Sequence, residues 1–260
     1  MLRYEDLVNN LNNHDDVNAY FMQFFTNDNY KEYVVDYSLN NDQKKAIKTM
    51  FTSKKELLKR AESALKIEPF CIEAFFVYFI LTEDIFVNYR FKSYFALSKE
   101  YGDLNEYDKY CYLKILDLYV QFLLDLHNFT TATKVQKMIN RLSNNVSKVA
   151  VSRMALIYSL LENSDDFYRL YLDSEFDGHD YILLLVTLLK NEDNLKAKEV
   201  LIDMFDNIEY SSYIDHLWDL NLDDPKQKEF YDIVENNFDD ISSIPDFFAW
   251  VNLTKESIGE

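Results

Sequence analysis

The chain has 260 residues, an apolar content of 48% and a formal net charge of −18. That balance is too apolar for a disordered chain, and the apolar runs are too short and too often interrupted by charge to span a bilayer. Only three glycines and three prolines are present, and sandwiches, barrels and doubly wound sheets need many more residues suited to tight turns. The composition therefore predicts an all-α protein.

Polar joints divide the chain into segments in which apolar residues recur at the spacing of an amphipathic helix. Glu68-Pro69 ends one helix, because a residue before proline avoids helical backbone angles. Asp224-Pro225 opens another, as an N-cap followed by proline in the first turn. In chain order the predicted helices are Tyr4–Asn12, Asp16–Thr26, Tyr30–Leu39, Gln43–Ile67, Phe70–Thr82, Ile85–Glu100, Asn105–Leu126, Thr130–Leu142, Ser147–Leu161, Asp165–Asp173, Asp180–Lys190, Asp193–Asp206, Tyr210–Leu220, Pro225–Asn237, and a last helix opened by Ser242, Ser243 and Pro245 that ends near Leu253.

The longest of these segments, Gln43–Ile67, favours a single helix. Ser53-x-x-Glu56 has the capping-box pattern that would break it. The apolar residues nevertheless stay on one face across that point, and a row of lysines stays on another. This lysine face consists of Lys44, Lys48, Lys55, Lys59 and Lys66. Its simplest interpretation is a solvated helix surface, and the sharper one is a docking surface for an acidic partner, formed by Lys44, Lys48, Lys55 and Lys59.

Charge is distributed unevenly along the chain. Residues 41–66 contain eight basic and three acidic residues, whereas residues 199–260 contain three lysines and sixteen acidic residues. Net acidity argues against nucleic acid as the main ligand, because phosphate contacts need clustered lysine and arginine. The acidic C-terminal region of a second copy is one candidate partner for the lysine face, which would make a homodimer. Solubility is the plainer role of that region.

Several segments have the pattern of paired-helix repeats. Ala64-Leu65-Lys66-Ile67-Glu68-Pro69 is typical of the end of a second repeat helix, and Phe129-x-x-Ala132 and Asn194-x-x-Ala197-x-x-x-Leu201 are typical of its start. From Asn41 to Leu220 the chain resembles the tetratricopeptide-repeat family. The resemblance implies a right-handed α-α superhelix of stacked helical hairpins. We therefore predict one elongated domain over residues 1–260, most repeat-like over 41–220, with helical capping regions at 1–40 and 221–260.

Aromatic residues are concentrated between Phe75 and Phe95. Most of them should pack in the core. Tyr78, Tyr89 and Tyr94 are the candidates for the surface, because a buried tyrosine must find a hydrogen-bond partner for its hydroxyl. On the concave face of stacked hairpins such side chains would anchor a bound peptide.

The residues that could carry catalysis or bind metal lack the required spacing. Asp173-Ser-Glu175-Phe-Asp177-Gly178 copies the first half of a calcium loop, but the second half has Asp180 and Leu184 where an apolar residue and a bidentate glutamate belong. We interpret it as a turn in which Gly178 ends one helix and Asp180 caps the next. The four histidines have no metal-ligand spacing, Asp215-His216 lies in a predicted helix, and no phosphate-binding loop is present. We predict no metal and no cofactor.

The two cysteines, Cys71 and Cys111, are predicted to be buried free thiols, which suits a reducing compartment, and the first residues lack a signal peptide. We therefore expect a cytoplasmic protein. The predicted function is that of a non-enzymatic scaffold that binds a protein or peptide partner. The alternatives are a regulator that binds a short signalling peptide in a helical groove, a highly diverged enzyme, and an acidic mimic of nucleic acid.

Overall fold

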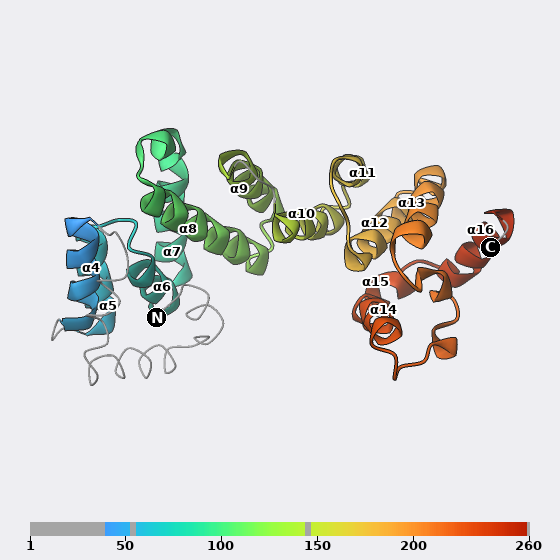
Figure 1. Cartoon of the computed structure of the whole chain (residues 1–260). Coiled ribbons are helices and arrows are strands. Elements are labelled where there is room, and N and C mark those ends of the chain that lie inside the picture. Colours follow the sequence, from blue (N-terminus) through green and yellow to red (C-terminus); the bar gives the residue numbers. More distant parts are fainter. Residues whose placement is uncertain (1–39, 53–55, 144–146, 259–260) are drawn as a thin grey trace. The chain divides into compact units, whose positions relative to one another are not determined.

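The computed structural model describes residues 40–52, 56–143 and 147–258. The three helices predicted before residue 40 lie outside these ranges. Within them all regular structure is helical, with thirteen α-helices, three short 3₁₀ segments and no strand, so the all-α prediction is confirmed (Figure 1). The chain divides into two compact units, Met1–Leu126 and His127–Glu260. The prediction of one domain stays a prediction, and each unit is described by itself.

Unit 1 is built from helices that pack on their neighbours in sequence. Helix α4 packs on α5, α5 on α6, and α7 on α8, while α6 also contacts α8. The elements are α4 (Asn41–Thr52), α5 (Leu57–Ile67), α6 (Ile72–Leu81), α7 (Asp84–Ala96), η1 (Leu97–Asp103) and α8 (Glu106–Asp125).

The prediction of a single helix over Gln43–Ile67 is wrong. Helix α4 ends at Thr52 and α5 begins at Leu57, and the two helices lie side by side (Figure 1). Both helices have one apolar face, and folding back lets each bury that face in the core. The residues buried in this way are Ala46, Ile47 and Met50 of α4 and Ala61, Ala64 and Leu65 of α5. The break falls where the Ser53-x-x-Glu56 pattern indicated one, although Ser53 itself lies outside the described residues.

Aromatic side chains fill the core of unit 1, as the sequence predicts for most of them. Phe75 and Phe91 are fully buried, and their ring centroids are 5.2 Å apart. Phe91 also stacks on Tyr119 of α8 at 4.6 Å, with an angle of 11° between the ring planes. Cys71 and Cys111 are buried free cysteines, which confirms the prediction for both. Burial raises the pKa of each thiol well above its ordinary value.

Unit 2 is organised around one almost fully buried helix, α12. Its residues from Tyr181 to Leu188 are all buried, and α10, α11, α13, α14 and α15 contact it. Gly178 lets this helix begin against α14, since a Cβ there would lie 3.0 Å from the Ile233 side chain. The elements are α9 (Phe129–Leu142), α10 (Lys148–Leu160), α11 (Ser164–Asp173), α12 (Gly178–Lys190), α13 (Asn194–Asn207), η2 (Ser211–Tyr213), η3 (Leu217–Asp219), α14 (Pro225–Asn236), α15 (Phe238–Ser242) and α16 (Phe247–Ile258).

The same tight joint precedes α11 and α13, and each joint closes a hairpin, α10 with α11 and α12 with α13. In both, a glutamate with positive φ is followed by a residue whose side chain caps the next helix. Glu162 has φ 51° and precedes Asn163, and Glu192 has φ 60° and precedes Asp193. His127, with φ 54°, precedes the cap Asn128 of α9 in the same local conformation. Ala132, four residues after the cap Asn128 of α9, and Ala197, four residues after the cap Asp193 of α13, are both fully buried.

Two further details of unit 2 differ from the prediction. The N-cap of α12 is Asp177, not Asp180: Asp180 N donates to Asp177 Oδ1 at 3.0 Å, and the Asp180 side chain accepts from Asp177 N in return. Gly178 is the first residue of that helix and not the end of the previous one. This reciprocal capping box satisfies two amide groups that a cap at Asp180 would leave unpaired.

The predicted helix Tyr210–Leu220 is also wrong, since two short 3₁₀ segments occupy that stretch. Tyr210 takes a left-handed conformation, with φ 64°. The Ser211 hydroxyl then donates to the carbonyl groups of Met204, in the last turn of α13, and of Ile208, which is the C-cap of that helix. Downstream, Asp224 caps α14 with Pro225 in its first turn, which confirms that predicted start. The last predicted helix corresponds to α16, which begins at Phe247 and continues to Ile258, and the short helix α15 before it was not predicted.

Candidate functional site

The lysine face does not lie along one helix. Lys44 and Lys48 are exposed on α4, and Lys59 and Lys66 are exposed on α5. Lys55 lies outside the described residues. Lys59 Nζ pairs with Glu56 at 3.1 Å. Because the helix is broken, the continuous row of charge on which the docking hypothesis depended is divided between two helices.

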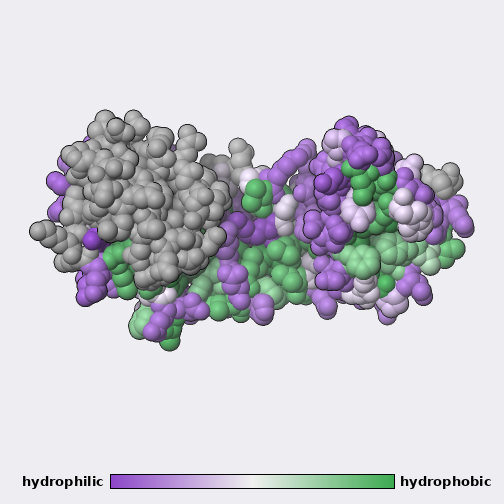
Figure 2. All heavy atoms as spheres, turned by 90° about the horizontal axis from the view of Figure 1, so that it is seen from below, coloured by the Kyte–Doolittle hydropathy of each residue, from purple (hydrophilic) through white to green (hydrophobic). Residues whose placement is uncertain are grey.

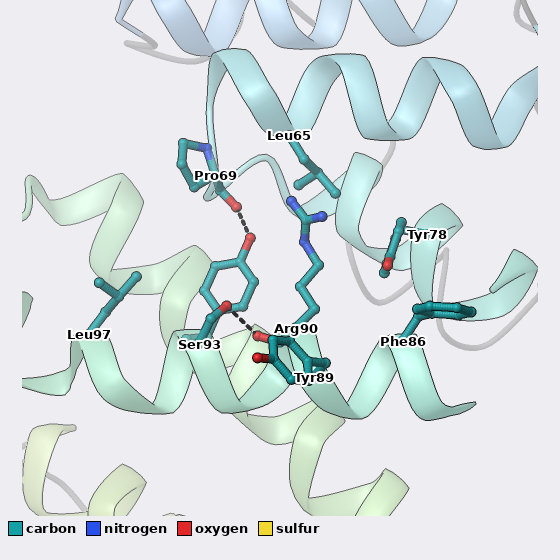
Figure 3. Close-up of a pocket in the computed structure, with 9 residues that line it drawn as sticks. Leu65, Pro69, Tyr78, Phe86, Tyr89, Arg90, Ser93 and Leu97 are labelled. Carbon is teal, nitrogen blue, oxygen red and sulfur yellow. Dashed lines mark hydrogen bonds between the residues drawn. The ribbon is translucent and has the colours of Figure 1, made fainter. Parts of the chain in front are cut away.

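The structure brings Tyr78, Tyr89 and Tyr94 together around one pocket of about 400 Å³ in unit 1, which we call the tyrosine pocket (Figure 3). Tyr89 is 81% exposed, so its prediction as a surface residue is confirmed. That prediction is wrong for Tyr78 and Tyr94, which are only 9% and 3% exposed. The pocket is lined by Leu65, Pro69, Tyr78, Phe86, Tyr89, Arg90, Ser93, Tyr94 and Leu97.

Tyr94 is buried because its hydroxyl has a partner inside the protein. The hydroxyl donates to the Pro69 carbonyl, shown by a dashed line in Figure 3, and the ring packs edge-on against Phe75 at 5.1 Å. Burial raises the pKa of Tyr94 to about 12. The hydroxyl therefore stays neutral and remains a donor at physiological pH.

Arg90 is the central residue of the tyrosine pocket, and the sequence analysis did not select it. It lies on α7, and Figure 3 shows its side chain extending along the pocket between Tyr78 and Pro69. Its guanidinium carbon lies 4.8 Å from the centroid of the Tyr78 ring, a cation–π contact. No carboxylate of the described residues forms an ion pair with Arg90, and its buried Nε has no hydrogen-bond partner there.

A second and larger pocket, of about 730 Å³, lies in unit 2, and we call it the tryptophan pocket. Trp218 stands at its edge with 78% of its surface exposed, and Leu222 and Phe238 are about half exposed. Figure 2, a view from below, shows hydrophobic residues reaching the surface of unit 2 among hydrophilic ones. The pocket is lined by Leu217, Trp218, Leu220, Leu222, Tyr231, Glu235, Asn236, Phe238 and Asp239.

The irregular segment that carries Trp218 is held in place by α16. Lys255 Nζ lies 2.9 Å from Asp215 Oδ1 and donates to the Ser212 carbonyl at 2.7 Å. Asp215 is buried, and the neighbouring His216 ring lies edge-on to Trp218 at 5.3 Å. The wrong helix prediction for Tyr210–Leu220 concealed this pocket. One signal was available, namely a tryptophan set between acidic residues in a segment rich in turn-forming serine and aspartate.

The described residues that line the two pockets include few charged groups. Among the described residues that line the tyrosine pocket, only Arg90 is charged, and the Ser93 hydroxyl there donates to the Arg90 carbonyl at 2.6 Å. The tryptophan pocket has two carboxylates, Glu235 and Asp239, without a lining histidine, lysine or cysteine. In the described part of the chain no three His, Cys, Asp or Glu side chains are grouped to hold a metal ion. None of the helices described there is long and apolar enough to cross a membrane.

Comparison of the chain with protein-family models, with curated proteins and with solved structures found no match.

Proposed function

We propose that this chain is a non-enzymatic scaffold that binds a peptide segment of a partner protein, and that the tryptophan pocket is its main binding site. The observation that supports the proposal is Trp218, which is 78% exposed beside an apolar pocket of about 730 Å³. Large exposed aromatic side chains at a concave apolar surface are the usual anchors of protein interfaces. Covering Trp218, Leu222 and Phe238 would remove apolar surface from water, which is the main driving force for association.

The charge around this pocket indicates a basic partner segment. Glu235 and Asp239 line the pocket, and residues 199–260 carry sixteen acidic residues against three lysines. Two of those lysines are already paired, Lys226 with Glu209 at 2.7 Å and Lys255 with Asp215 at 2.9 Å. A ligand with an apolar anchor and flanking lysine or arginine residues would complement both features. A second copy of the chain, presenting Lys44, Lys48 and Lys59, is one source of such a segment.

We also propose that the helices form a tetratricopeptide-like solenoid. The support is the repeated joint in unit 2, where α10 with α11 and α12 with α13 form hairpins through the same turn. Repetition of one turn conformation gives successive hairpins a similar internal geometry, which is the basis of stacking in such folds. The buried thiols Cys71 and Cys111 suit a reducing compartment, and we propose that the chain acts in the cytoplasm.

The test uses the full chain and two synthetic amphipathic peptides with leucines on one face, one with lysines on the other face and one with glutamates in their place. We expect the lysine peptide to bind and the glutamate peptide not to bind, in fluorescence anisotropy at low salt. Trp218→Ala should weaken binding by at least about tenfold, the effect of losing an interface hot spot. Glu235→Gln with Asp239→Asn should weaken it and reduce its salt dependence.

The matched control is Asp173→Asn with Asp206→Asn, because both residues are exposed in unit 2 and neither lines the pocket. This pair removes the same charge as the pocket pair. If the control weakens binding as much as the pocket variants do, the attraction comes from net charge and the proposal is wrong. Native affinity in the Trp218→Ala variant would also contradict it.

A further inference from the structure

Arg90 lines the tyrosine pocket, and none of the described acidic side chains forms an ion pair with it. Several described basic residues pair with a carboxylate, including Lys109 with Glu106 at 2.9 Å, Lys196 with Asp193 at 2.7 Å and Lys255 with Asp215 at 2.9 Å. The chain supplies 45 acidic residues for such pairing. Arg90 instead makes a cation–π contact with Tyr78, and its Nε is buried without an acceptor.

An unsatisfied buried donor is costly, and native structures seldom keep one without a reason. Glu68 is a described acid that acts electrostatically on Tyr94 of this pocket. Glu68 forms no ion pair with Arg90, and its Oε1 accepts from Phe70 N at 3.1 Å. The pocket therefore contains a guanidinium that contacts the Tyr78 ring and the Tyr94 hydroxyl, keeps its Nε unsatisfied, and has no ion pair with a described carboxylate.

The surface next to Arg90 is apolar. Ile85, Phe86 and Tyr89 lie on the first two turns of α7 and are 70%, 58% and 81% exposed. Phe86 and Tyr89 also line the pocket, and Figure 3 shows them beside Arg90 on the same helix. A ligand that reached Arg90 would therefore place its neighbouring groups on Phe86 and Tyr89.

We propose that the tyrosine pocket binds the carboxylate of an acidic peptide segment. The Arg90 guanidinium binds the carboxylate, and Phe86 and Tyr89 contact an adjacent apolar side chain of the peptide. A guanidinium offers parallel N–H donors that match the two oxygens of a carboxylate. One positive charge suits a monoanion, whereas phosphate groups are usually bound by several cations together. This pocket lies in the other unit and takes a partner of opposite charge, so the inference does not depend on the tryptophan pocket.

The chain itself makes the test stringent. A protein with a net charge of −18 repels anionic peptides in general. Binding of an acidic probe therefore requires a local cationic site. Three short labelled peptides with the same phenylalanine are used with the full chain: one with an internal glutamate and an amidated C-terminus, one with glutamine and a free C-terminal carboxylate, and one with glutamine and an amidated C-terminus.

We expect at least one of the two carboxylate peptides to bind and the neutral peptide not to bind, in fluorescence anisotropy at low salt. Binding of the glutamate peptide would show that Arg90 takes a side-chain carboxylate. Binding of the peptide with the free C-terminus would show that it takes the carboxylate of a chain terminus. Arg90→Gln should weaken binding by at least about tenfold, as for other charge-assisted hydrogen bonds. Arg90→Lys, which keeps the charge and loses the fork, should weaken it by a smaller factor.

The matched control is Lys92→Gln, an exposed lysine on the same helix that removes the same charge. It should bind as the native chain does. Equal binding of all three peptides, no binding of either carboxylate peptide, or an equal loss in Lys92→Gln and Arg90→Gln overturns the proposal. A phosphoserine peptide that binds where the glutamate peptide fails also overturns it. Circular dichroism checks that the variants keep their helices, and Arg90→Lys remains informative if Arg90→Gln does not fold.

Discussion

The two pockets of this chain are opposite in charge and are built in different ways. The tyrosine pocket is lined mainly by residues of the regular helix α7, and Arg90 is the one charged side chain among its described lining residues. The tryptophan pocket is bordered on one side by an irregular segment, and its charges are the carboxylates of Glu235 and Asp239. A pocket set by helix packing should tolerate the loss of one polar contact. A pocket that depends on an irregular segment should depend strongly on the interaction that holds that segment.

The largest effect is therefore expected at Lys255. Lys255→Ala leaves the carboxylate of Asp215, which is 6% exposed, without its cation. We expect the free energy of unfolding to fall by about 3 kcal/mol, the cost of breaking a buried ion pair from one side. Urea unfolding followed by circular dichroism measures it. Asp215→Asn added to Lys255→Ala should recover part of the loss, because the unpaired charge is gone.

Lys228→Ala is the control for this substitution, because Lys228 is an exposed lysine of the same unit. It should change the free energy of unfolding by less than about 0.5 kcal/mol. Equal effects of the two substitutions would show that the Asp215–Lys255 pair does not hold the segment, and the contrast between the pockets would then fail.

A smaller effect is expected in the tyrosine pocket. Tyr94→Phe removes the donor to the Pro69 carbonyl but keeps the buried ring. The free energy of unfolding should fall by about 1 kcal/mol, typical of one net hydrogen bond. Tyr89→Phe, at an 81% exposed position, should leave it unchanged. Thermal or urea unfolding of both variants measures the difference, and equal stabilities would show that the hydroxyl contributes nothing.

The same tyrosine predicts a pH effect with a definite sign. Its pKa is raised from 10.0 to about 12 in the folded chain, so the unfolded chain loses the proton first as the pH rises. The stability that Tyr94 contributes is therefore present below about pH 10 and is lost between about pH 10 and pH 12. Stability of the Tyr94→Phe variant should fall less steeply over that window.

The smallest expected effect is a gain in stability from a substitution in the joint that precedes α13. Glu192 has φ 60°, a left-handed conformation that costs a residue with a Cβ more than it costs glycine. Glu192→Gly should raise the free energy of unfolding by about 0.5 kcal/mol, since strain relief exceeds the added freedom of the unfolded chain. Glu192→Ala keeps the Cβ and should give no such gain. Reduced stability of the glycine variant would show that the joint is not strained.

The sequence predicted the regular helices well because their signals are local. Asn105 and Ser147 cap α8 and α10, and Asp224-Pro225 opens α14, through contacts within a single turn. The apolar spacing of the chain also predicts which faces are buried. Such signals do not say whether two in-phase segments form one helix or fold back on each other. The Gln43–Ile67 prediction failed for that reason, since burial of both faces in the core decided the outcome.

The candidate sites were less predictable because they depend on distant contacts. Tyr78 and Tyr94 were expected at the surface, but each found its partner elsewhere in unit 1, Arg90 and Pro69 respectively. The role of Arg90 depends on the absence of a paired acid, which no sequence pattern expresses. The tryptophan pocket depends on the contact of Lys255 with Asp215, 40 residues apart in the chain.

The placement of cysteine and tryptophan gives each unit a reporter of its own. The only cysteines, Cys71 and Cys111, are buried in unit 1, and the only tryptophans, Trp218 and Trp250, lie in unit 2. A thiol reagent can modify Cys71 or Cys111 only when unit 1 opens, because burial keeps each sulfur covered and protonated. The rate of cysteine alkylation therefore reports on unit 1, and the tryptophan emission reports on unit 2, in the same unlabelled molecule. The native chain can thus show whether its two units open together or one at a time.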